Sequence, residues 1–362
     1  MITRTEIRPC LGMLAIILIS AVAGPSQAGE IRDETRQLLP DDGAAGNRFG
    51  VSVAIAGPTA IVGAYFDDDN GPQSGSAYLF NVASGTQAFK LLPNDGATGD
   101  QFGVSVGIAG DTAIVGADNL GQSGSAYLFD ATNGQQLAQL LPDDGTAQDW
   151  FGRSVATSDT TALVGAPTAI LGGAAYLFDV ETGEQTAKLL ADDGAFGDRF
   201  GWSVGIAGPT AVVGAFLDDD NGTSSGSAYL FDATTGQQIA KLLPSDGAPG
   251  DRFGSSVAIS GTMALVGAYS DDDQGTDSGS AYLFAVTTGQ PYAKLRPNDG
   301  AASDKIARSV PISGTTPVAA ETLGRSWISV DRYGEYVAAG GLRHTAQANP
   351  DTWINPDLLN AV

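Results

Sequence analysis

The sequence predicts an all-β protein, a β-propeller of four-stranded antiparallel blades, and three observations favour this fold class. One unit of roughly fifty residues recurs five times along the 362-residue chain. Each unit contains four short strand-like runs separated by turn residues. No stretch combines the 3.6-residue period of an α-helix with capping residues. Repeated sets of four strands are typical of radially arranged blades.

Three landmarks recur in the same order and define the repeat. A Phe-Gly pair begins at Phe49, Phe102, Phe151, Phe200 and Phe253; a Val-Gly-Ala triplet ends at Ala64, Ala117, Ala166, Ala215 and Ala268; an Ala-Tyr-Leu-Phe run ends at Phe80, Phe129, Phe178, Phe231 and Phe284. The propeller is therefore expected over residues 29–343, with repeats at about 41–93, 94–142, 143–190, 191–243 and 244–297 and a degenerate repeat at 298–343. The remaining residues, 344–362, are expected to form an irregular tail.

The two ends of the repeat region predict how the ring closes. Residues 35–40 (TRQLLP) match the fourth strand of a unit, but no other strand of that unit precedes them. Residues 299–320 are a degraded copy of the first two strands, and residues 325–330 are expected to supply the third. An N-terminal strand that completes the last blade leaves no exposed sheet edge. We favour six blades on this basis, with five or seven as alternatives, because residues 333–339 would supply an additional strand.

The first 28 residues are predicted to be a signal peptide. Arg4 and Arg8 precede an apolar run at residues 11–23, and small residues follow at 26–28. We therefore expect a secreted, periplasmic or cell-surface protein with no transmembrane segment after removal of the signal. The single cysteine, Cys10, lies in this segment. The mature chain would then contain no disulfide and no thiol nucleophile.

The charge balance is strongly acidic and restricts the class of partner. The chain has 41 Asp and Glu against 18 Lys and Arg. Such a charge repels nucleic acids and anionic membranes and attracts cations or basic partners. More than half of the acidic residues fall in the predicted loops between strands 2 and 3 and in the connections between blades. Both kinds of loop leave the same face of a propeller, so we expect this face to be acidic. It would bind a protein or carbohydrate ligand, and a basic ligand would complement its charge. No oligomeric state follows from the sequence.

Three strand 2–3 loops contain a run of three aspartates, which we consider as candidate calcium ligands. The nine residues are Asp67, Asp68, Asp69, Asp218, Asp219, Asp220, Asp271, Asp272 and Asp273. Hard carboxylate oxygens close to a glycine suit calcium. The glycine of DDDNG and DDDQG, however, comes one position too early for the usual calcium loop. A solvated turn and a direct partner contact therefore remain alternatives.

Two further residues of the repeat are interpreted structurally. The aspartate of the Gly-Asp-Arg-Phe-Gly segment, for example Asp251, is expected to accept backbone N–H groups of its own loop. The phenylalanine that follows is expected to pack between blades. Arg48, Arg199 and Arg252 are expected to pair with neighbouring aspartates.

The three landmarks resemble the FG-GAP repeat of the integrin alpha-subunit propeller and of bacterial exported proteins, over about residues 35–320. The resemblance implies a propeller whose faces bind ligands, often in adhesion and often with calcium in the blades. One departure matters, because the integrin-type calcium loop lies between the first and second strands. Here that connection is a tight turn, such as residues 56–58. The family's calcium site is therefore not transferred to these positions.

The combined expectation is an exported, non-enzymatic propeller for binding, adhesion or scaffolding that uses its acidic face, with calcium as an optional cofactor. The only histidine, His344, lies in the predicted tail, so a histidine-based triad or zinc site does not fit the propeller. Repeated loops also argue against catalysis, because an active site is asymmetric. The alternatives are a carboxylate-based hydrolase acting in the propeller channel and a purely structural surface protein.

Overall fold

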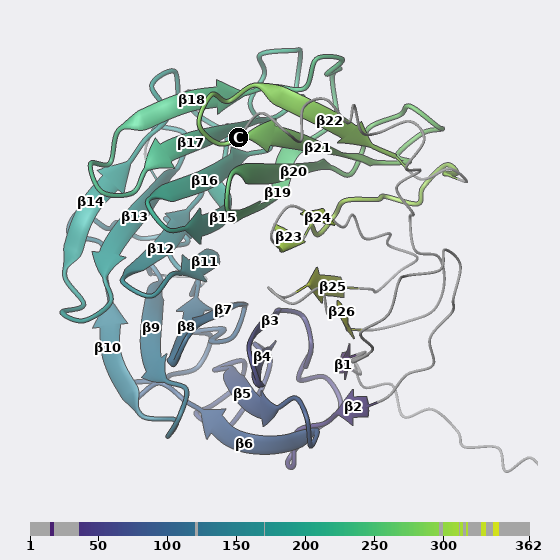
Figure 1. Cartoon of the computed structure of the whole chain (residues 1–362). Helices are drawn as coiled ribbons and strands as arrows, with labels where there is room; N and C mark the ends of the chain where they lie inside the picture. Colours follow the sequence, from purple (N-terminus) through teal and green to yellow (C-terminus); the bar gives the residue numbers. More distant parts are fainter. Residues whose placement is uncertain are drawn as a thin grey trace, which may run out of the picture.

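The computed structural model describes residues 36–119, 122–169, 171–296 and 300–310 and the backbone of a few short strands outside them. These strands are β1 (Ala15–Ile17), β23 (Ile312–Ser313), β24 (Thr316–Pro317), β25 (Trp327–Val330) and β26 (Tyr336–Ala339). Every regular element in the described part of the chain is a strand, which confirms the all-β class. Five four-stranded sheets are arranged around a central axis (Figure 1).

Each blade is an antiparallel meander whose first strand is nearest the axis and whose fourth strand is on the outside (Figure 1). The strands are β3 (Val53–Ala56), β4 (Thr59–Ala64), β5 (Ser76–Asn81) and β6 (Thr86–Leu91) in the first blade; β7 (Ser105–Ala109), β8 (Thr112–Ala117), β9 (Ser125–Asp130) and β10 (Gln136–Leu140) in the second; β11 (Ser154–Thr157), β12 (Thr161–Ala166), β13 (Ala174–Asp179) and β14 (Gln185–Leu189) in the third; β15 (Phe200–Ala207), β16 (Thr210–Ala215), β17 (Ser227–Asp232) and β18 (Gln238–Leu242) in the fourth; and β19 (Phe253–Ser260), β20 (Met263–Ala268), β21 (Ser280–Ala285) and β22 (Pro291–Leu295) in the fifth.

The two middle strands of each blade are buried on both faces. In β4 and β5, for example, Val62 pairs with Tyr78, and both side chains are fully buried. These strands are packed between two neighbouring blades, so that both faces of the pleat contact apolar groups. The middle strands are therefore apolar at almost every position, whereas the outer strand β6 begins with alternating exposed and partly buried residues.

The landmark phenylalanine fills the space between consecutive blades, as expected. Phe253 is fully buried, and its ring contacts Tyr282 and Phe284 edge-on at centroid distances of 5.4 and 5.8 Å. Leu242, the last residue of the preceding blade's outer strand, lies in the same apolar cluster. Equivalent clusters contain Phe102, Phe151 and Phe200. Edge-to-face geometry adds to the free energy gained by burying each ring.

A glycine of the strand 2–3 loop allows consecutive blades to approach closely. Gly226 forms an isolated parallel bridge with Phe253 of the next blade. A Cβ atom at Gly226 would lie 2.0 Å from the carbonyl oxygen of Phe253, and the φ angle is +84°. Glycine is required here for both reasons. The glycine two positions before each Ala-Tyr-Leu-Phe run and the phenylalanine of the next Phe-Gly pair therefore form one contact between blades.

The degenerate repeat follows the predicted pattern in its first two strands. Ile306 and Ala307 are buried in the places of Phe and Gly, and Ser256 Oγ donates to the Ala307 carbonyl at 2.7 Å, as Ser203 does to Gly254 at 2.8 Å. Strands β23 and β24 pair through Ser313 and Thr316, the register that Ser260 and Met263 show in β19 and β20. The described residues of 306–317 therefore resemble the hairpin that the first two strands of a complete blade form.

Strand β2 (Arg36–Leu38) packs against the first blade as a fourth strand does elsewhere. Leu38 is fully buried with Phe49, Tyr78 and Phe80, which is the position that Leu242 takes beside Phe253. However, β2 pairs with β1, and β25 pairs with β26. The sixth sector between β22 and β3 thus contains two-stranded sheets (Figure 1). A complete sixth blade closed by the N-terminal strand stays a prediction, and β26 is the additional strand expected at residues 333–339.

The described residues leave two expectations about the chain ends open. Of the predicted signal peptide, only the backbone of β1 is described, and the predicted tail from residue 344 lies outside the described residues. Within the described part of the chain, we find no helix with the length and apolar character needed to span a bilayer.

Candidate functional site

The predicted acidic loops and blade connections meet on one face of the propeller. In the fifth blade, Asp271 lies in the strand 2–3 loop and Asp246 lies in the connection that enters the blade. Both carboxylates lie within hydrogen-bonding distance of the Tyr282 hydroxyl, at 2.6 Å for Asp271 and 3.1 Å for Asp246. The tyrosine of the Ala-Tyr-Leu-Phe run therefore holds the two kinds of acidic segment together. Tyr78 and Tyr229 do the same in the first and fourth blades.

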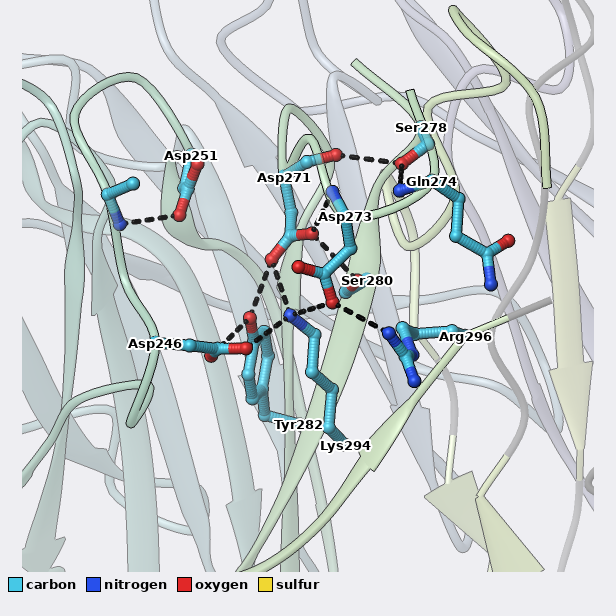
Figure 2. Close-up of polar contacts among 11 residues, drawn as sticks. Asp246, Asp251, Asp271, Asp273, Gln274, Ser278, Ser280, Tyr282, Lys294 and Arg296 are labelled. Carbon is cyan, nitrogen blue, oxygen red and sulfur yellow. Dashed lines mark hydrogen bonds and ion pairs between the residues drawn. The ribbon is translucent and has the colours of Figure 1, made fainter. Parts of the chain in front are cut away.

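A lysine from the outer strand lies at the centre of each of these carboxylate groups. Lys294 Nζ is 2.7 Å from Asp246, 2.9 Å from Asp271 and 2.6 Å from Asp273 (Figure 2). An ammonium group has three N–H donors, so three carboxylates satisfy it completely. Lys241 contacts Asp193, Asp218 and Asp220 at 2.6, 3.1 and 2.5 Å, and Lys90 contacts Asp42, Asp67 and Asp69. We call these three groups the lysine-centred clusters.

Burial and charge shift the pKa values within a cluster. Burial alone lowers the pKa of Lys294, but its hydrogen bonds to Asp246, Asp273 and Asp271 outweigh this and raise the pKa above the usual range. Burial raises the pKa of Tyr282, and the neighbouring Asp271 raises it further. For Asp271, which is 2% exposed, burial raises the pKa, but hydrogen bonds from Tyr282 and Lys294 bring it below the usual value. Lys294 and Asp271 thus stay ionised at neutral pH.

The middle aspartate of each run has a separate role in the loop. Asp272 Oδ1 accepts the backbone N–H of Asp277 at 2.7 Å, and Asp68 and Asp219 accept those of Gln73 and Ser224 at 2.7 and 2.6 Å. The first aspartate also accepts the N–H of the third, at 3.0 Å for Asp271. Each predicted triplet is therefore split. Its first and third members contact the lysine, its middle member closes the loop, and the nine residues form three separate groups.

This arrangement does not fit a calcium ion at the position that the lysine occupies. Calcium takes six to eight oxygen ligands, and a protonated lysine among those oxygens would repel it. Among the described residues, no cluster of three or more metal-ligating side chains is arranged to hold an ion. Calcium binding by these loops stays a prediction, and it would require the lysine to move away.

The second and third blades contain simpler versions of the cluster. In the second, Gln139 replaces the lysine and donates to Asp95 at 2.9 Å, while Asp118 pairs with Arg153 at 3.1 Å. In the third, Lys188 contacts Asp144 at 2.5 Å, and Asp144 accepts a hydrogen bond from Tyr176. These blades lack the aspartate triplet, as the sequence shows. The second and third blades therefore serve as internal controls for the lysine-centred clusters of the first, fourth and fifth blades.

The aspartate of the Gly-Asp-Arg-Phe-Gly segment is a structural residue, as expected. Asp251 is buried, and its Oδ2 accepts the backbone N–H of Ala248 at 2.7 Å (Figure 2). Burial raises the pKa of Asp251 to about 6, and the charge of Asp271 adds to this, whereas the hydrogen bond from Ala248 opposes it. A raised pKa means that the folded protein binds this proton more readily than the unfolded chain. The stability that Asp251 contributes is therefore present at low pH and is lost as the pH rises through about 6.

Replacing Asp251 by asparagine should remove this pH dependence. Asparagine keeps a side-chain oxygen for the Ala248 N–H but is not ionised. We expect the stability of the variant relative to wild type to increase by about 2 kcal/mol between pH 4 and pH 7. Denaturant unfolding at four pH values across this range measures the difference. A difference that stays constant with pH would contradict the assignment.

A second group of side chains, at the inner edge of the same face, combines cations with aromatic rings. Phe253 pairs with Ala268, so Arg252 and Tyr269 lie just beyond the paired ends of β19 and β20. Arg252 Nη1 donates to the Tyr269 hydroxyl, and its guanidinium carbon is 5.4 Å from the ring centroid. We call this group the inner rim; its members are Arg48, Tyr65, Phe66, Trp150, Arg153, Arg199, Trp202, Phe216, Arg252, Tyr269, Lys305 and Arg308.

The inner rim was not anticipated from the sequence, which suggested aspartate partners for three of its arginines. Arg48 instead lies over Phe66 at 4.4 Å, and Arg199 lies over Trp150 at 5.2 Å. The rings belong to the residues beyond the Val-Gly-Ala triplet or to those directly before or after Phe-Gly, positions at which the repeats differ. The variation of these positions among otherwise similar repeats was the sequence feature from which the inner rim could have been predicted.

Comparison with known proteins agrees with this geometry. The family model of the FG-GAP repeat matches residues 33–80, 86–129, 135–178, 184–231 and 237–284, more than half of the chain. The chain belongs to the FG-GAP repeat family. Each FG-GAP match contains a fourth strand followed by the first three strands of the next blade. The first match therefore treats β2 as the equivalent of β6, in agreement with the packing of Leu38.

Similarity to solved structures adds evidence on the fold of this FG-GAP protein but not on its function. A crystal structure of the computationally designed Ika8 protein aligns with a TM-score of 0.50 at 14% sequence identity, over 80% of this chain and 70% of that one. No curated protein matches the chain.

The FG-GAP chain keeps the predicted departure from the integrin-type calcium loop. Ala56 pairs with Thr59 in β3 and β4, so only two residues connect the first two strands. No acidic residue lies in this turn, and Asp67, Asp68 and Asp69 of the same blade follow the opposite end of β4.

Proposed function

We propose that this FG-GAP propeller is an exported, non-enzymatic binding module that acts in adhesion or scaffolding through its acidic loop face. The observation that supports the proposal most directly is that the same side-chain contacts hold the strand 2–3 loop in place in several blades. In three blades the same lysine, tyrosine and aspartates fix the strand 2–3 loop to the blade connection. A surface that is already ordered loses little conformational entropy on binding a partner.

The exposed carboxylates that remain outside the clusters favour a basic partner. Asp68, Asp219 and Asp272 are exposed and use one oxygen for the loop. Asp41, Asp143 and Asp192 in the blade connections are exposed as well. We call these six residues the outer acidic ring. Opposite charge accelerates association and improves selectivity, and repeated copies allow a multivalent partner to bind several blades at once.

The test compares two triple variants that carry the same charge change. Asp68→Asn, Asp219→Asn and Asp272→Asn neutralise part of the outer acidic ring but keep an acceptor for the loop N–H groups. Asp130→Asn, Asp179→Asn and Asp232→Asn do the same in the strand 3–4 turns, at the other ends of the blades, where these residues accept turn N–H groups. Binding to immobilised poly-L-lysine is measured by biolayer interferometry at physiological salt.

We expect the loop-face variant to bind at least about tenfold more weakly and the turn variant to change by less than about twofold. Equal losses in the two variants would show that net charge alone attracts the probe, and the proposal of a dedicated acidic face would fail. Thermal unfolding of both variants checks that the losses do not come from unfolding.

A further inference from the structure

The inner rim is where the repeats differ from one another. The residue before each Phe-Gly or its counterpart is Arg48, Gln101, Trp150, Arg199, Arg252 or Lys305. The neighbouring Phe, Val-Gly-Ala and Ser-Ala-Tyr-Leu-Phe segments are almost unchanged from copy to copy. A specific ligand needs an asymmetric surface, and the three lysine-centred clusters, which repeat the same contacts, do not provide one. The inner rim does.

The backbone at this position is costly for the side chains that occupy it. All six residues have positive φ angles, from 51° at Lys305 to 63° at Arg199. A left-handed conformation disfavours any residue with a Cβ atom, by about 1 kcal/mol or more. Glycine would avoid this cost. Large cationic or aromatic side chains occupy the position instead in five of the six copies, which indicates that the side chains themselves are needed.

Three cations converge on one ring at the fifth blade. The guanidinium carbons of Arg252 and Arg308 lie 5.4 and 5.7 Å from the Tyr269 centroid, and Lys305 Nζ lies 5.7 Å from it. Lys305 also pairs with Asp277, at 3.4 Å. The charges of Lys305 and Arg252 lower the pKa of Asp277, together with a hydrogen bond from Ser270. Three cations around one ring repel one another, and an anionic ligand bound beside them would reduce this repulsion.

The remaining arginines of the inner rim are held in place by aromatic rings. Arg153 lies over Trp202 at 4.8 Å and pairs with Asp118, and Trp202 packs against Phe216 at 4.6 Å. A stacked guanidinium keeps its N–H groups along the edge of its plane, where they match a carboxylate or sulfate. Trp150, Trp202 and Tyr269 are only half-buried and present flat apolar surface beside these cations.

We propose that the inner rim binds an acidic polysaccharide. Its carboxylate or sulfate groups would contact Arg252, Lys305 and Arg308, and its sugar rings would pack against the tyrosine and tryptophan rings of the rim. This inference shares with the proposed function only the assignment of the loop face as the binding face. The outer acidic ring does not prevent such binding, because salt screens exposed charges beyond about 8 Å at physiological ionic strength.

The experiment uses dextran sulfate as the probe and uncharged dextran as its control. The whole protein carries a formal charge of −23, so nonspecific attraction to dextran sulfate is not expected. We expect saturable binding of dextran sulfate that weakens with added NaCl, and no binding of dextran. Arg252→Gln with Arg308→Gln should weaken the binding at least about tenfold. Lys188→Gln, which removes a cation from the outside of the third blade, should change it by less than about twofold.

Two results would overturn the proposal. One is an affinity for dextran sulfate that the rim variant and the Lys188 control change equally. The other is tighter binding of poly-L-glutamate than of dextran sulfate, which would assign the rim to an acidic peptide. Poly-L-lysine binding by the same rim variant separates this test from that of the outer acidic ring, because loss of the rim cations should leave it undiminished.

Discussion

Replacing Lys294 by methionine is expected to lower the free energy of unfolding by about 3 kcal/mol at neutral pH. The change keeps the apolar stem but removes the ammonium that contacts Asp246, Asp271 and Asp273. Asp271 is buried, so its charge would be left without its counter-ion in a place with little water. Denaturant unfolding at pH 7 measures the loss.

The matched control is Lys188→Met in the third blade. Lys188 contacts a single, half-exposed carboxylate, that of Asp144. An exposed pair of this kind contributes less than about 1 kcal/mol, so the control variant should be nearly as stable as wild type. Equal losses in the two variants would mean that the number of carboxylates around the ammonium does not determine its contribution to stability.

The response to calcium is a second measurement, made on the Lys294 variant and on wild type. The Lys294 variant should gain thermal stability in millimolar calcium relative to EDTA, because three carboxylates are then available to a divalent ion. Wild type should respond much less. A large response of wild type, lost in Asp→Asn variants of the three triplets, would support calcium-ordered loops instead of loops neutralised by lysine.

Substituting Gly226 by alanine should destabilise the protein by at least about 3 kcal/mol. The new methyl carbon would lie 2.0 Å from the Phe253 carbonyl oxygen, in a backbone with a φ of +84°. Neither the loop nor the next blade can withdraw without breaking their bridge and shifting the buried Phe253 ring. Thermal and denaturant unfolding should both show the loss.

Gly208→Ala separates the clash from the backbone conformation. Gly208 also has a positive φ, of +53°, but no atom lies within 4 Å of the position of its missing Cβ. Its replacement should cost only about 1 kcal/mol. If the two alanine variants were equally destabilised, strain at φ and not the contact between blades would account for the effect of Gly226.

The fold could be predicted because its determinants are local or repeated. Phe253, Tyr282 and Gly226 have counterparts at fixed spacing in the other complete repeats, and the four-strand pattern between them leaves little choice of architecture. The position of Leu38 was also predictable, since TRQLLP matches a fourth strand. The strands paired in the sixth sector were not, because residues 318–343 have lost the landmarks by which a register is recognised.

The chemistry of the acidic loops was only half predictable. The aspartates are conspicuous, but Lys294 is 48 residues from Asp246 and 23 from Asp271, and no local pattern connects them. Comparison of the repeats contained a clue, since the triplets occur only in repeats whose outer strand has lysine at this place. Repeat three, which has Lys188 without a triplet, weakens that clue. The residues of the inner rim are brought together by the pairing of the first and second strands, so they could not be grouped before the register of these strands was known.

The near-identity of the contacts between blades has a consequence for how the chain folds. A surface made by Phe, Tyr and Leu on one blade is complementary to every other blade, not only to its neighbour in sequence. Such contacts cannot by themselves distinguish the correct partner from a copy one repeat further along or on another molecule. Short connections between blades must therefore impose the order, and repeat proteins of this kind are prone to domain-swapped assembly when concentrated during refolding. The same interchangeability would let a gene gain or lose a whole repeat while every remaining interface still finds a matching surface.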